Sequence, residues 1–256
     1  MSTYRRYADY LKEKYGGKVY KIPVNLPVTC PNRDGTCGKG GCTFCSEVGI
    51  GYEMLDTHMA ISKQIEENIA YIGKRYKADT FIAYLQNFSN TYMPLETFEE
   101  VLGQIKHEKL VGISISTRPD CIHDAYLEKI KAWQDETGYD VCIELGLQTL
   151  NYHALEKINR GHGLSEYIDA VLRIKRYGFE ICTHLILNLP WDNQLDVIEN
   201  AKLMSVLGID YVKLHALYIV KNTVMGQQYL KGEFDMISME EYEERVITFL
   251  RYLSED

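Results

Sequence analysis

The amino-acid sequence predicts an α/β fold in which six strands and their following helices form an open, partial (βα)6 TIM-like barrel, preceded by a short N-terminal helix. Short apolar runs with strand character alternate along the chain with segments of helical periodicity. Strands that alternate with helices pair in parallel. Six βα units are too few to close an eight-stranded barrel. Because no linker or change in composition divides the chain, residues 1–256 are expected to form one domain.

Each predicted element follows from a local pattern. Strands are expected at residues 19–26, 80–85, 111–116, 141–147, 180–187 and 211–217. Helices are expected at residues 3–15, 61–76, 97–107, 124–136, 152–158, 165–177, 194–207 and 238–253. Two of these helices are predicted to begin with a capping box, Thr97-x-x-Glu100 and Ser238-x-x-Glu241.

Four of the seven cysteines lie close together in a glycine-rich stretch, at Cys30, Cys37, Cys42 and Cys45. Thiolates are soft ligands, so this stretch can bind zinc or an iron–sulfur cluster. A zinc site usually takes four ligands in two paired knuckles, and the spacing here differs from that pattern. A cluster can use three cysteines and leave one iron open. Structural zinc and inert buried thiols remain alternatives at this point.

The composition suits a globular domain with a sizeable core, since 46% of the 256 residues are hydrophobic and 25% are charged. The chain contains no apolar run of about 18 residues, so no membrane span is expected. The N-terminal residues also show no apolar signal core. Seven cysteines without a paired framework argue for a reducing compartment, and we expect the protein to be cytoplasmic.

The charge is unevenly distributed along the chain. The net charge of −8 argues mildly against a nucleic-acid partner. Residues 1–40, however, carry eight basic and three acidic residues, and five tyrosines are interleaved with them. This segment is either a nucleic-acid-binding face beside the cysteine stretch or a solvated amphipathic helix.

Polar side chains gather where the predicted strands end. They are Gln86, Asn87, Asn90 and Thr91 after the second strand, Ser116 and Arg118 at the third, Glu144 and Gln148 at the fourth, His184 in the fifth and His215 in the sixth. Each of them alone could be a helix cap or a satisfied core residue. Because the carboxyl ends of parallel strands meet at one edge of the sheet, the set predicts a polar cofactor site beside the cysteines.

Several phrases of the sequence resemble those of a known family: TCPNRDGT, GGCTFCSE, STRPDCI, ELGLQT, INRGH and VKLHALYIVKNT. They resemble the radical S-adenosylmethionine (SAM) superfamily, and within it the YtqA/YhcC type, which is MnmL-like and related to the catalytic subunit of Elongator. The spacing Cys30-x11-Cys42-x2-Cys45 and the aromatic Phe44 match this type. The resemblance extends from about residue 21 to about residue 234.

The resemblance implies a [4Fe–4S] cluster bound by Cys30, Cys42 and Cys45, with Cys37 outside the ligand set. It also implies a SAM site, in which Gln148 and Arg160 resemble a pair of SAM-binding residues in oxygen-independent coproporphyrinogen oxidases. His184 falls where that family has a ribose-binding residue. The full set of expected SAM contacts is Phe44, Gln86, Asn87, Asn90, Thr91, Ser116, Arg118, Glu144, Gln148, Arg160, His184 and Leu189.

The implied activity is reductive cleavage of SAM to a 5′-deoxyadenosyl radical, with an electron donor such as flavodoxin or ferredoxin. The implied substrate is tRNA, at the 5-carboxymethylaminomethyl substituent of the wobble uridine. Two alternatives are a radical SAM enzyme that acts on a small metabolite or a tetrapyrrole, and a non-catalytic zinc- or Fe–S-binding interaction module. Relatives of this type continue past the last predicted helix, and we expect that C-terminal extension to be absent here.

Overall fold

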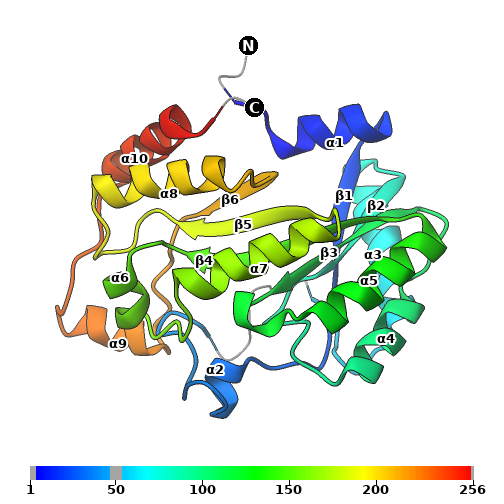
Figure 1. Ribbon diagram of the computed structural model, residues 1–256, viewed down its shortest axis with the longest axis horizontal. Helices are drawn as coiled ribbons and strands as arrows, with labels where there is room; N and C mark the ends of the chain where they lie inside the picture. Colours follow the sequence, from blue (N-terminus) through cyan, green and yellow to red (C-terminus); the bar gives the residue numbers. More distant parts are fainter. Residues whose placement is uncertain (1–3, 47–53, 255–256) are drawn as a thin grey trace.

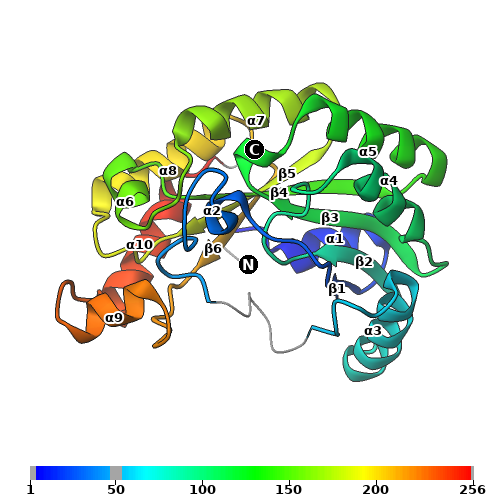
Figure 2. The same ribbon diagram turned by 90° about the horizontal axis from the view of Figure 1, so that it is seen from below.

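The computed structural model describes residues 4–46 and 54–254, and its centre is a six-stranded parallel sheet. The strands are β1 (Val19–Val24), β2 (Thr80–Leu85), β3 (Leu110–Thr117), β4 (Asp140–Gln148), β5 (Glu180–Ile186) and β6 (Tyr211–His215). They pair in the order β1-β2-β3-β4-β5-β6, and every neighbouring pair is parallel. Each strand lies where the sequence predicts one, and the sheet curls into the expected open half-barrel (Figure 2).

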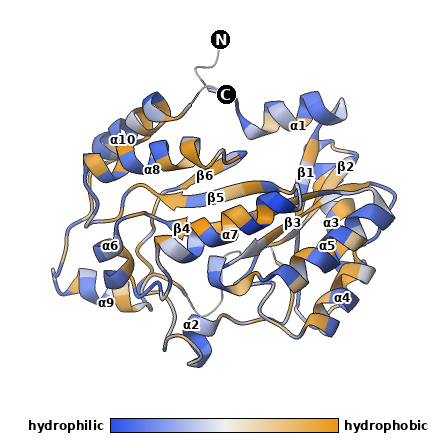
Figure 3. Cartoon of the chain, viewed as in Figure 1, coloured by the Kyte–Doolittle hydropathy of each residue, from blue (hydrophilic) through white to orange (hydrophobic). Residues whose placement is uncertain are grey.

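Helices cover the convex outer face of this sheet (Figures 1 and 2). They are α3 (Ile61–Tyr76), α4 (Leu95–Gln104), α5 (Asp124–Thr137), α6 (Tyr152–Lys157), α7 (Leu164–Arg176) and α8 (Gln194–Val206), with α10 (Met239–Tyr252) packed against α8. Hydrophobic residues concentrate on the strands, as Figure 3 shows, and the buried residues of the helices pack against the sheet in the main core. The helices therefore bury one face of the sheet and leave the concave face free for chemistry.

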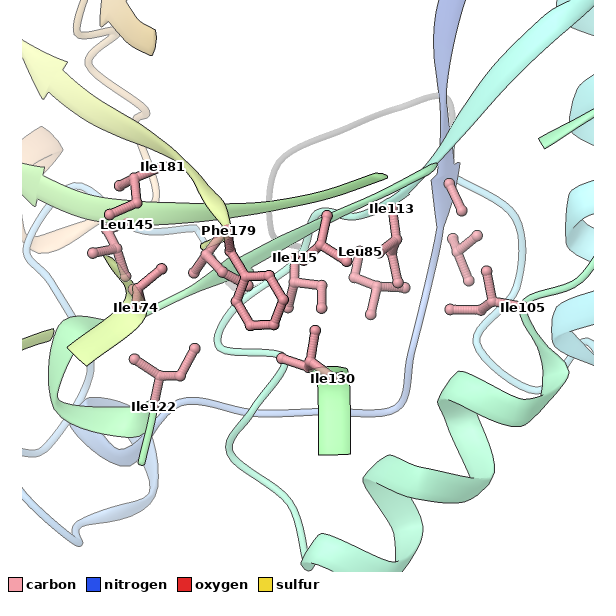
Figure 4. Packing of buried hydrophobic residues seen from close by; sticks show 14 of the residues in the cluster. Leu85, Ile105, Ile113, Ile115, Ile122, Ile130, Leu145, Ile174, Phe179 and Ile181 are labelled. Atoms are coloured by element: carbon pink, nitrogen blue, oxygen red, sulfur yellow. The ribbon is translucent and has the colours of Figure 1, made fainter. Parts of the chain in front are cut away.

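The two faces of the sheet differ because successive side chains of a strand point to opposite sides. Apolar residues on the convex face form the main core with the helices; Figure 4 shows Leu85, Ile113, Ile115, Leu145 and Ile181 of the sheet near Ile105, Ile122, Ile130, Ile174 and Phe179. The intervening positions carry the polar residues Lys21, Tyr84, Ser116, Glu144, His184 and Lys213. These side chains meet inside the half-barrel.

The structure departs from the sequence-based prediction at one helix start. Helix α4 begins at Leu95 after Pro94, so Thr97 lies within the first turn and forms no cap. The predicted Thr97 capping box is therefore wrong, because proline in the preceding position already sets the entry of the helix. The cap at Ser238 is confirmed, since its hydroxyl accepts a hydrogen bond from the backbone N–H of Glu241 at 3.2 Å.

Two short helices were not predicted, namely α2 (Pro31–Asp34) inside the cysteine stretch and α9 (Val224–Leu230) after β6. Pro119–Cys121 also form a single 3-10 turn. Both α2 and α9 lie at the end of the sheet where the strands finish, close to α6 (Figure 1). Helix α2 has only four residues, too few to show helical periodicity, and α9 contains Gly226, which weakens the helical signal.

The N-terminal helix α1 (Tyr7–Tyr15) lies at the opposite end of the sheet from α2 (Figure 1). The rings of Tyr7 and Tyr10 pack on Tyr211 at centroid distances of 5.0 and 5.3 Å. Lys14 forms ion pairs with Asp140 and Glu180. This helix therefore seals the base of the half-barrel, and the expectation of a basic face beside the cysteines does not hold for it.

None of the helices in residues 4–46 and 54–254 has the length and apolar character that crossing a membrane would require.

Truncation of a core residue on the convex face should destabilise the protein. Ile115 is fully buried, and Ile115→Ala should lower the free energy of unfolding by about 2–5 kcal/mol, because the substitution removes apolar contacts and leaves a cavity. Urea denaturation followed by circular dichroism measures this change. The control Leu172→Ala, at a side chain that is 56% exposed, should change stability by at most about 0.5 kcal/mol. Equal effects of the two substitutions would contradict the assignment of this core.

Candidate functional site

The cysteine loop, residues 25–46, follows β1 and lies across the mouth of the half-barrel, at the carboxyl ends of the strands (Figure 2). Cys30 is the residue before α2, and Gly35 follows this helix in a left-handed conformation with φ of 98°. Cys42 is buried, Cys30 and Cys45 are partly exposed, and Cys37 is exposed. All four are free thiols. The loop thus brings the three expected cluster ligands to the same end of the sheet as the predicted cofactor site.

Each of the three expected ligands lies beside a different arginine. The sulfur-to-nitrogen distances are 3.9 Å from Cys30 to Arg118, 3.4 Å from Cys42 to Arg160 and 3.5 Å from Cys45 to Arg33. A guanidinium beside a sulfur favours the thiolate form, which is the form that binds metal. Burial has the opposite effect at Cys45, whose pKa is raised. The arginines therefore supply positive charge where three thiolates would gather.

The cysteine loop holds no closely spaced set of three ligands. Sulfurs bound to one zinc ion at about 2.3 Å cannot be more than about 4.6 Å apart. Within the described part of the chain, three potential ligand atoms within 4.8 Å of one another occur only in the group Glu144, Cys182 and His184. No three of the loop sulfurs therefore lie that close together in this structure. Cys37 shares Arg118 with Cys30, at 3.6 Å from Nη2.

Residues 158–162, the INRGH phrase, form a bracket that holds the cysteine loop in place. The backbone N–H of Thr43 donates to the Ile158 carbonyl at 2.9 Å. The side-chain amide of Asn159 donates to the carbonyls of Gly41 at 2.8 Å and Lys39 at 3.3 Å. Asn159 itself adopts a left-handed conformation with φ of 53°, which asparagine tolerates better than most residues. Helix α9 holds the loop from another side, because the Met225 N–H donates to the Thr43 carbonyl at 2.9 Å.

Gln148 and Arg160 lie together over Gly146, as the predicted SAM pair requires. A Cβ atom on Gly146 would be 2.7 Å from Nη2 of Arg160 and 2.8 Å from Nε2 of Gln148. The absence of a side chain at Gly146 therefore makes room for both. Gln148 has φ of 78° at an irregularity in the pairing of β4 with β5, which redirects its side chain. Nη2 of Arg160 donates to the Gly146 carbonyl at 2.6 Å, and its buried Nε has no partner among the described residues.

The loop after β2 is held by bonds that its own polar groups make. The amide of Asn90 donates to the carbonyls of Leu85 and Ser116 at 2.9 Å and to that of Asn87 at 3.0 Å. The Oδ1 atom of Asn90 is buried without a partner among the described residues. Thr91 bonds to Thr117 at 2.6 Å. Asn87 donates to Asn25 at 2.9 Å, and Gln86 is partly exposed. These contacts leave Asn90 Oδ1 and Gln86 as the groups best able to meet a ligand.

Arg118, Phe44 and Leu189 support the loop from within the protein. The guanidinium of Arg118 is buried, forms a two-point ion pair with Asp120 and donates to the Arg160 carbonyl at 2.8 Å. Phe44 and the fully buried Leu189 belong to one small hydrophobic cluster that also contains Met225. The geometry favours a structural role for Arg118 and Leu189 in holding the cysteine loop over the direct SAM contact that the resemblance implies.

Glu144 is the centre of a polar cluster inside the half-barrel. Its carboxylate is buried and pairs with Lys21 of β1, and it accepts hydrogen bonds from Tyr84 of β2 at 2.8 Å and His184 of β5 at 2.6 Å. Ser116 of β3 donates to the Tyr84 hydroxyl at 3.2 Å. Burial alone would raise the carboxyl pKa, but the His184 hydrogen bond and the Lys21 charge lower it below its usual value. Glu144 is therefore ionised.

His184 uses both ring nitrogens inside this cluster. Its Nε2 contacts Glu144, and its Nδ1 lies 3.2 Å from Nε2 of His215 on β6. These contacts leave no ring nitrogen free for a ribose hydroxyl, the contact that the resemblance implies. Burial lowers the pKa of His184, and burial together with His184 and Lys213 lowers that of His215 to about 4. Both rings are therefore neutral near pH 7.

Lys21, Tyr84, Lys213, Arg33 and Asn159 are site residues that the sequence analysis did not assign. Three of them could have been found, because Lys21, Tyr84 and Lys213 occupy alternate strand positions that face away from the apolar side. The partners of Arg33 and Asn159 depend on how the loop folds, and no local pattern indicates them.

A three-cysteine loop at the mouth of an open βα barrel is the arrangement of an enzyme that uses an iron–sulfur cluster with SAM. Comparison with known families agrees, because the model of the radical SAM superfamily matches residues 27–204 and that of the radical SAM C-terminal domain matches residues 209–256. This chain belongs to the radical SAM superfamily and is a radical SAM enzyme. Its cofactors are accordingly a [4Fe–4S] cluster and SAM.

Similarity to curated proteins indicates which type of radical SAM protein this chain resembles. Protein YhcC of Escherichia coli is 35% identical over 235 residues, which cover 91% of this chain and 74% of that protein. Protein YtqA of Bacillus subtilis is 35% identical over 248 residues, which cover 94% and 76%. A more distant relative is the tRNA uridine(34) acetyltransferase of Dehalococcoides mccartyi, 22% identical over 138 residues, 53% of this chain and 29% of that protein.

Solved structures show the same fold. The archaeal Elp3 of Methanocaldococcus infernus superposes with a TM-score of 0.60 at 18% identity, and the match covers 91% of this chain and 53% of that one. The coproporphyrinogen III oxidase of Escherichia coli, described as a radical SAM enzyme, gives a TM-score of 0.62 at 15% identity and covers 97% and 56%. This chain thus spans little more than half of each of these proteins.

The residues present fit the two cofactors. The loop offers free thiols, and Cys30, Cys42 and Cys45 each have an adjacent guanidinium. Close by, the unpartnered Arg160 Nε and Asn90 Oδ1 are buried polar atoms that a bound molecule with amino and carboxylate groups could satisfy.

Loss of the Asn159 bracket should loosen the hold on the cluster. Asn159→Gly keeps the left-handed backbone accessible but removes the two hydrogen bonds to the loop, so an iron chelator should extract iron about tenfold faster. Anaerobic iron release with time measures this rate. The matched control Lys77→Gly changes another residue with φ of 53°, far from the loop at the end of α3, and should release iron at the wild-type rate. Identical rates for the two variants would refute the role of the bracket.

Proposed function

We propose that this enzyme holds its cluster through Cys30, Cys42 and Cys45 and binds SAM with Gln148 and Arg160. The observation that carries this proposal is the position of Arg160, whose Nη1 lies 3.4 Å from the Cys42 sulfur while Gln148 shares the space over Gly146. A guanidinium is a planar donor that suits a carboxylate. From this position Arg160 can orient the carboxylate of SAM beside the cluster ligand.

When bound, the cluster supplies an electron that breaks a carbon–sulfur bond of SAM and starts radical chemistry on the substrate. The chain contributes orientation and exclusion of water. Asn90 Oδ1 can accept a hydrogen bond from an amino group, and Phe44 extends the small hydrophobic cluster next to Cys45. Anaerobic reconstitution tests this part: four irons per chain and reductive SAM cleavage are expected, whereas one tight zinc without SAM binding would instead identify an interaction module.

We propose tRNA as the substrate, modified at the 5-carboxymethylaminomethyl substituent of the wobble uridine. The support is the likeness to proteins named tRNA uridine(34) acetyltransferase and to the Elp3 fold. We further propose that the enzyme works in the cytoplasm with a reductant such as flavodoxin or ferredoxin. Helix α1 gives no support, since its two lysines are matched by two acidic residues and it lies at the other end of the sheet (Figure 1).

The tRNA proposal is tested by the nucleosides of a deletion strain. Mass spectrometry of its tRNA should show the 5-carboxymethylaminomethyl nucleoside accumulating and its product missing. Incubation of that tRNA with the reconstituted enzyme should restore the product, and the variant Cys42→Ala, which lacks a cluster ligand, should not. Unchanged nucleosides together with intact SAM cleavage would point to the first alternative, a small metabolite or tetrapyrrole.

Lysines around the mouth should carry the electrostatic part of tRNA binding. Lys39, Lys157 and Lys221 are exposed on the cysteine loop, on α6 and before α9. Replacing all three by alanine should flatten the dependence of log K on log salt by about 2, since each phosphate contact contributes about 0.7–0.9. Fluorescence titration of tRNA across salt concentrations measures the slope.

The matched control for this prediction replaces Lys12 and Lys18, two exposed lysines at the opposite end of the sheet. Their alanine variants should keep the wild-type slope. A slope that falls with the control lysines but not with the mouth lysines would place the tRNA on the other end of the protein. A slope near zero for the wild type would remove tRNA as a substrate.

A further inference from the structure

A chain of three side chains crosses the interior of the half-barrel. Oε2 of Glu144 on β4 lies 2.6 Å from Nε2 of His184 on β5, and Nδ1 of His184 lies 3.2 Å from Nε2 of His215 on β6. The two imidazole rings are 5.0 Å apart between centroids. A carboxylate that orients one histidine, which in turn orients a second, is an arrangement that controls where protons sit.

The protons of this chain can be assigned from its charges. Glu144 is ionised, so it only accepts, and Nε2 of His184 must donate to it. Because His184 is neutral, its Nδ1 carries a lone pair and accepts from Nε2 of His215. Nδ1 of His215 is then left as a free acceptor, and no described residue bonds to it. Burial, which lowers the pKa of both histidines, maintains this neutral arrangement.

We propose that Glu144 and His184 are positioning residues that fix His215 in the tautomer whose Nδ1 accepts a hydrogen bond from the substrate. A substrate N–H donates to this Nδ1, and no covalent bond of the substrate breaks in this contact. Both imidazoles stay neutral, because the pKa of His215 is lowered to about 4. Glu144 thus acts on the substrate only through the orientation of the two rings.

The neighbours of His215 indicate the class of group that it meets. Lys213 lies two residues earlier on the same face of β6, donates to the Tyr84 hydroxyl at 3.2 Å and has a side chain that is 41% exposed. Its ammonium can pair with a carboxylate while His215 accepts from an amine. The site therefore suits a substituent that carries both an amine and a carboxylate. This choice rests on the proposed function, since the carboxymethylaminomethyl group has both.

The same cluster contains a possible metal-binding group, Glu144, Cys182 and His184, but its charges argue against a cation. Lys21 already pairs with the carboxylate. Burial raises the pKa of the Cys182 thiol to about 12, so the thiol stays protonated near pH 7. Both nitrogens of His184 are engaged. A hydrogen-bonded relay accounts for these groups without a metal.

The tautomer of His215 can be tested without any substrate. Long-range proton–nitrogen correlation spectra of the cluster-loaded protein with 15N-labelled histidine should show His215 and His184 as neutral rings protonated at Nε2. His215→Gln and His184→Gln assign the two signals. In Glu144→Gln, or in His184→Gln if the first variant does not fold, His215 should become a mixture of tautomers. A wild-type His215 that is protonated at Nδ1 would overturn the proposal.

Turnover tests the role of the free nitrogen. With tRNA from the deletion strain, His215→Leu, which removes the acceptor, should lower kcat/KM about tenfold, and His215→Gln, whose amide oxygen accepts a hydrogen bond, should restore part of that loss. The surface control His123→Gln should keep the wild-type kcat/KM. A wild-type kcat/KM in His215→Leu would refute this contact. If the wild-type enzyme fails to act on tRNA, the proposal that tRNA is the substrate is wrong. The tautomer measurement still decides whether Glu144 and His184 position His215.

Discussion

The alternation of side chains along a strand is the constraint on which the rest of this structure depends. In strands β1 to β5 one set of positions is largely apolar and buried under the helices, as with Ile113 and Ile115, and the matching positions of β6 are partly buried. The other set faces the concave interior, and there it includes a carboxylate, two lysines and two histidines. A one-residue slip of any strand would exchange these sets. The same alternation of residues along the strands therefore determines both the fold and the polar interior.

Charge compensation organises both halves of the site. At the mouth, three arginines lie next to three cysteines, so the protein meets a cluster of thiolates with guanidinium groups already in place. Inside the half-barrel, one buried carboxylate takes contacts from strands β1, β2 and β5. An ionised group in such a position is costly unless it is paired. Glu144 therefore ties strands together, and the charges that surround it fix the protonation of its neighbours.

Much of this arrangement could be predicted from the sequence, and the remainder could not for identifiable reasons. Periodicity indicated all six strands, and the cysteine spacing with the quoted phrases indicated the family. Helix α2 was missed because four residues show no period, and α9 because Gly226 weakens its helical pattern. Thr97 was misjudged as a cap because Pro94 sets the helix entry. The hydrogen bonds from Asn159 to the cysteine loop join residues that are about 120 positions apart in the sequence, and no local sequence pattern indicates such a contact.

The half-barrel is open along one side, because β1 and β6 are the two ends of the sheet and do not pair within the described residues. A closed barrel admits only molecules, or parts of molecules, that can enter through one of its ends. A half-barrel that is open on one side can instead accept one protruding group while the rest of the substrate molecule stays outside. The geometry of the sheet thus sets no upper limit on the size of the molecule that is modified, only on the part of it that enters.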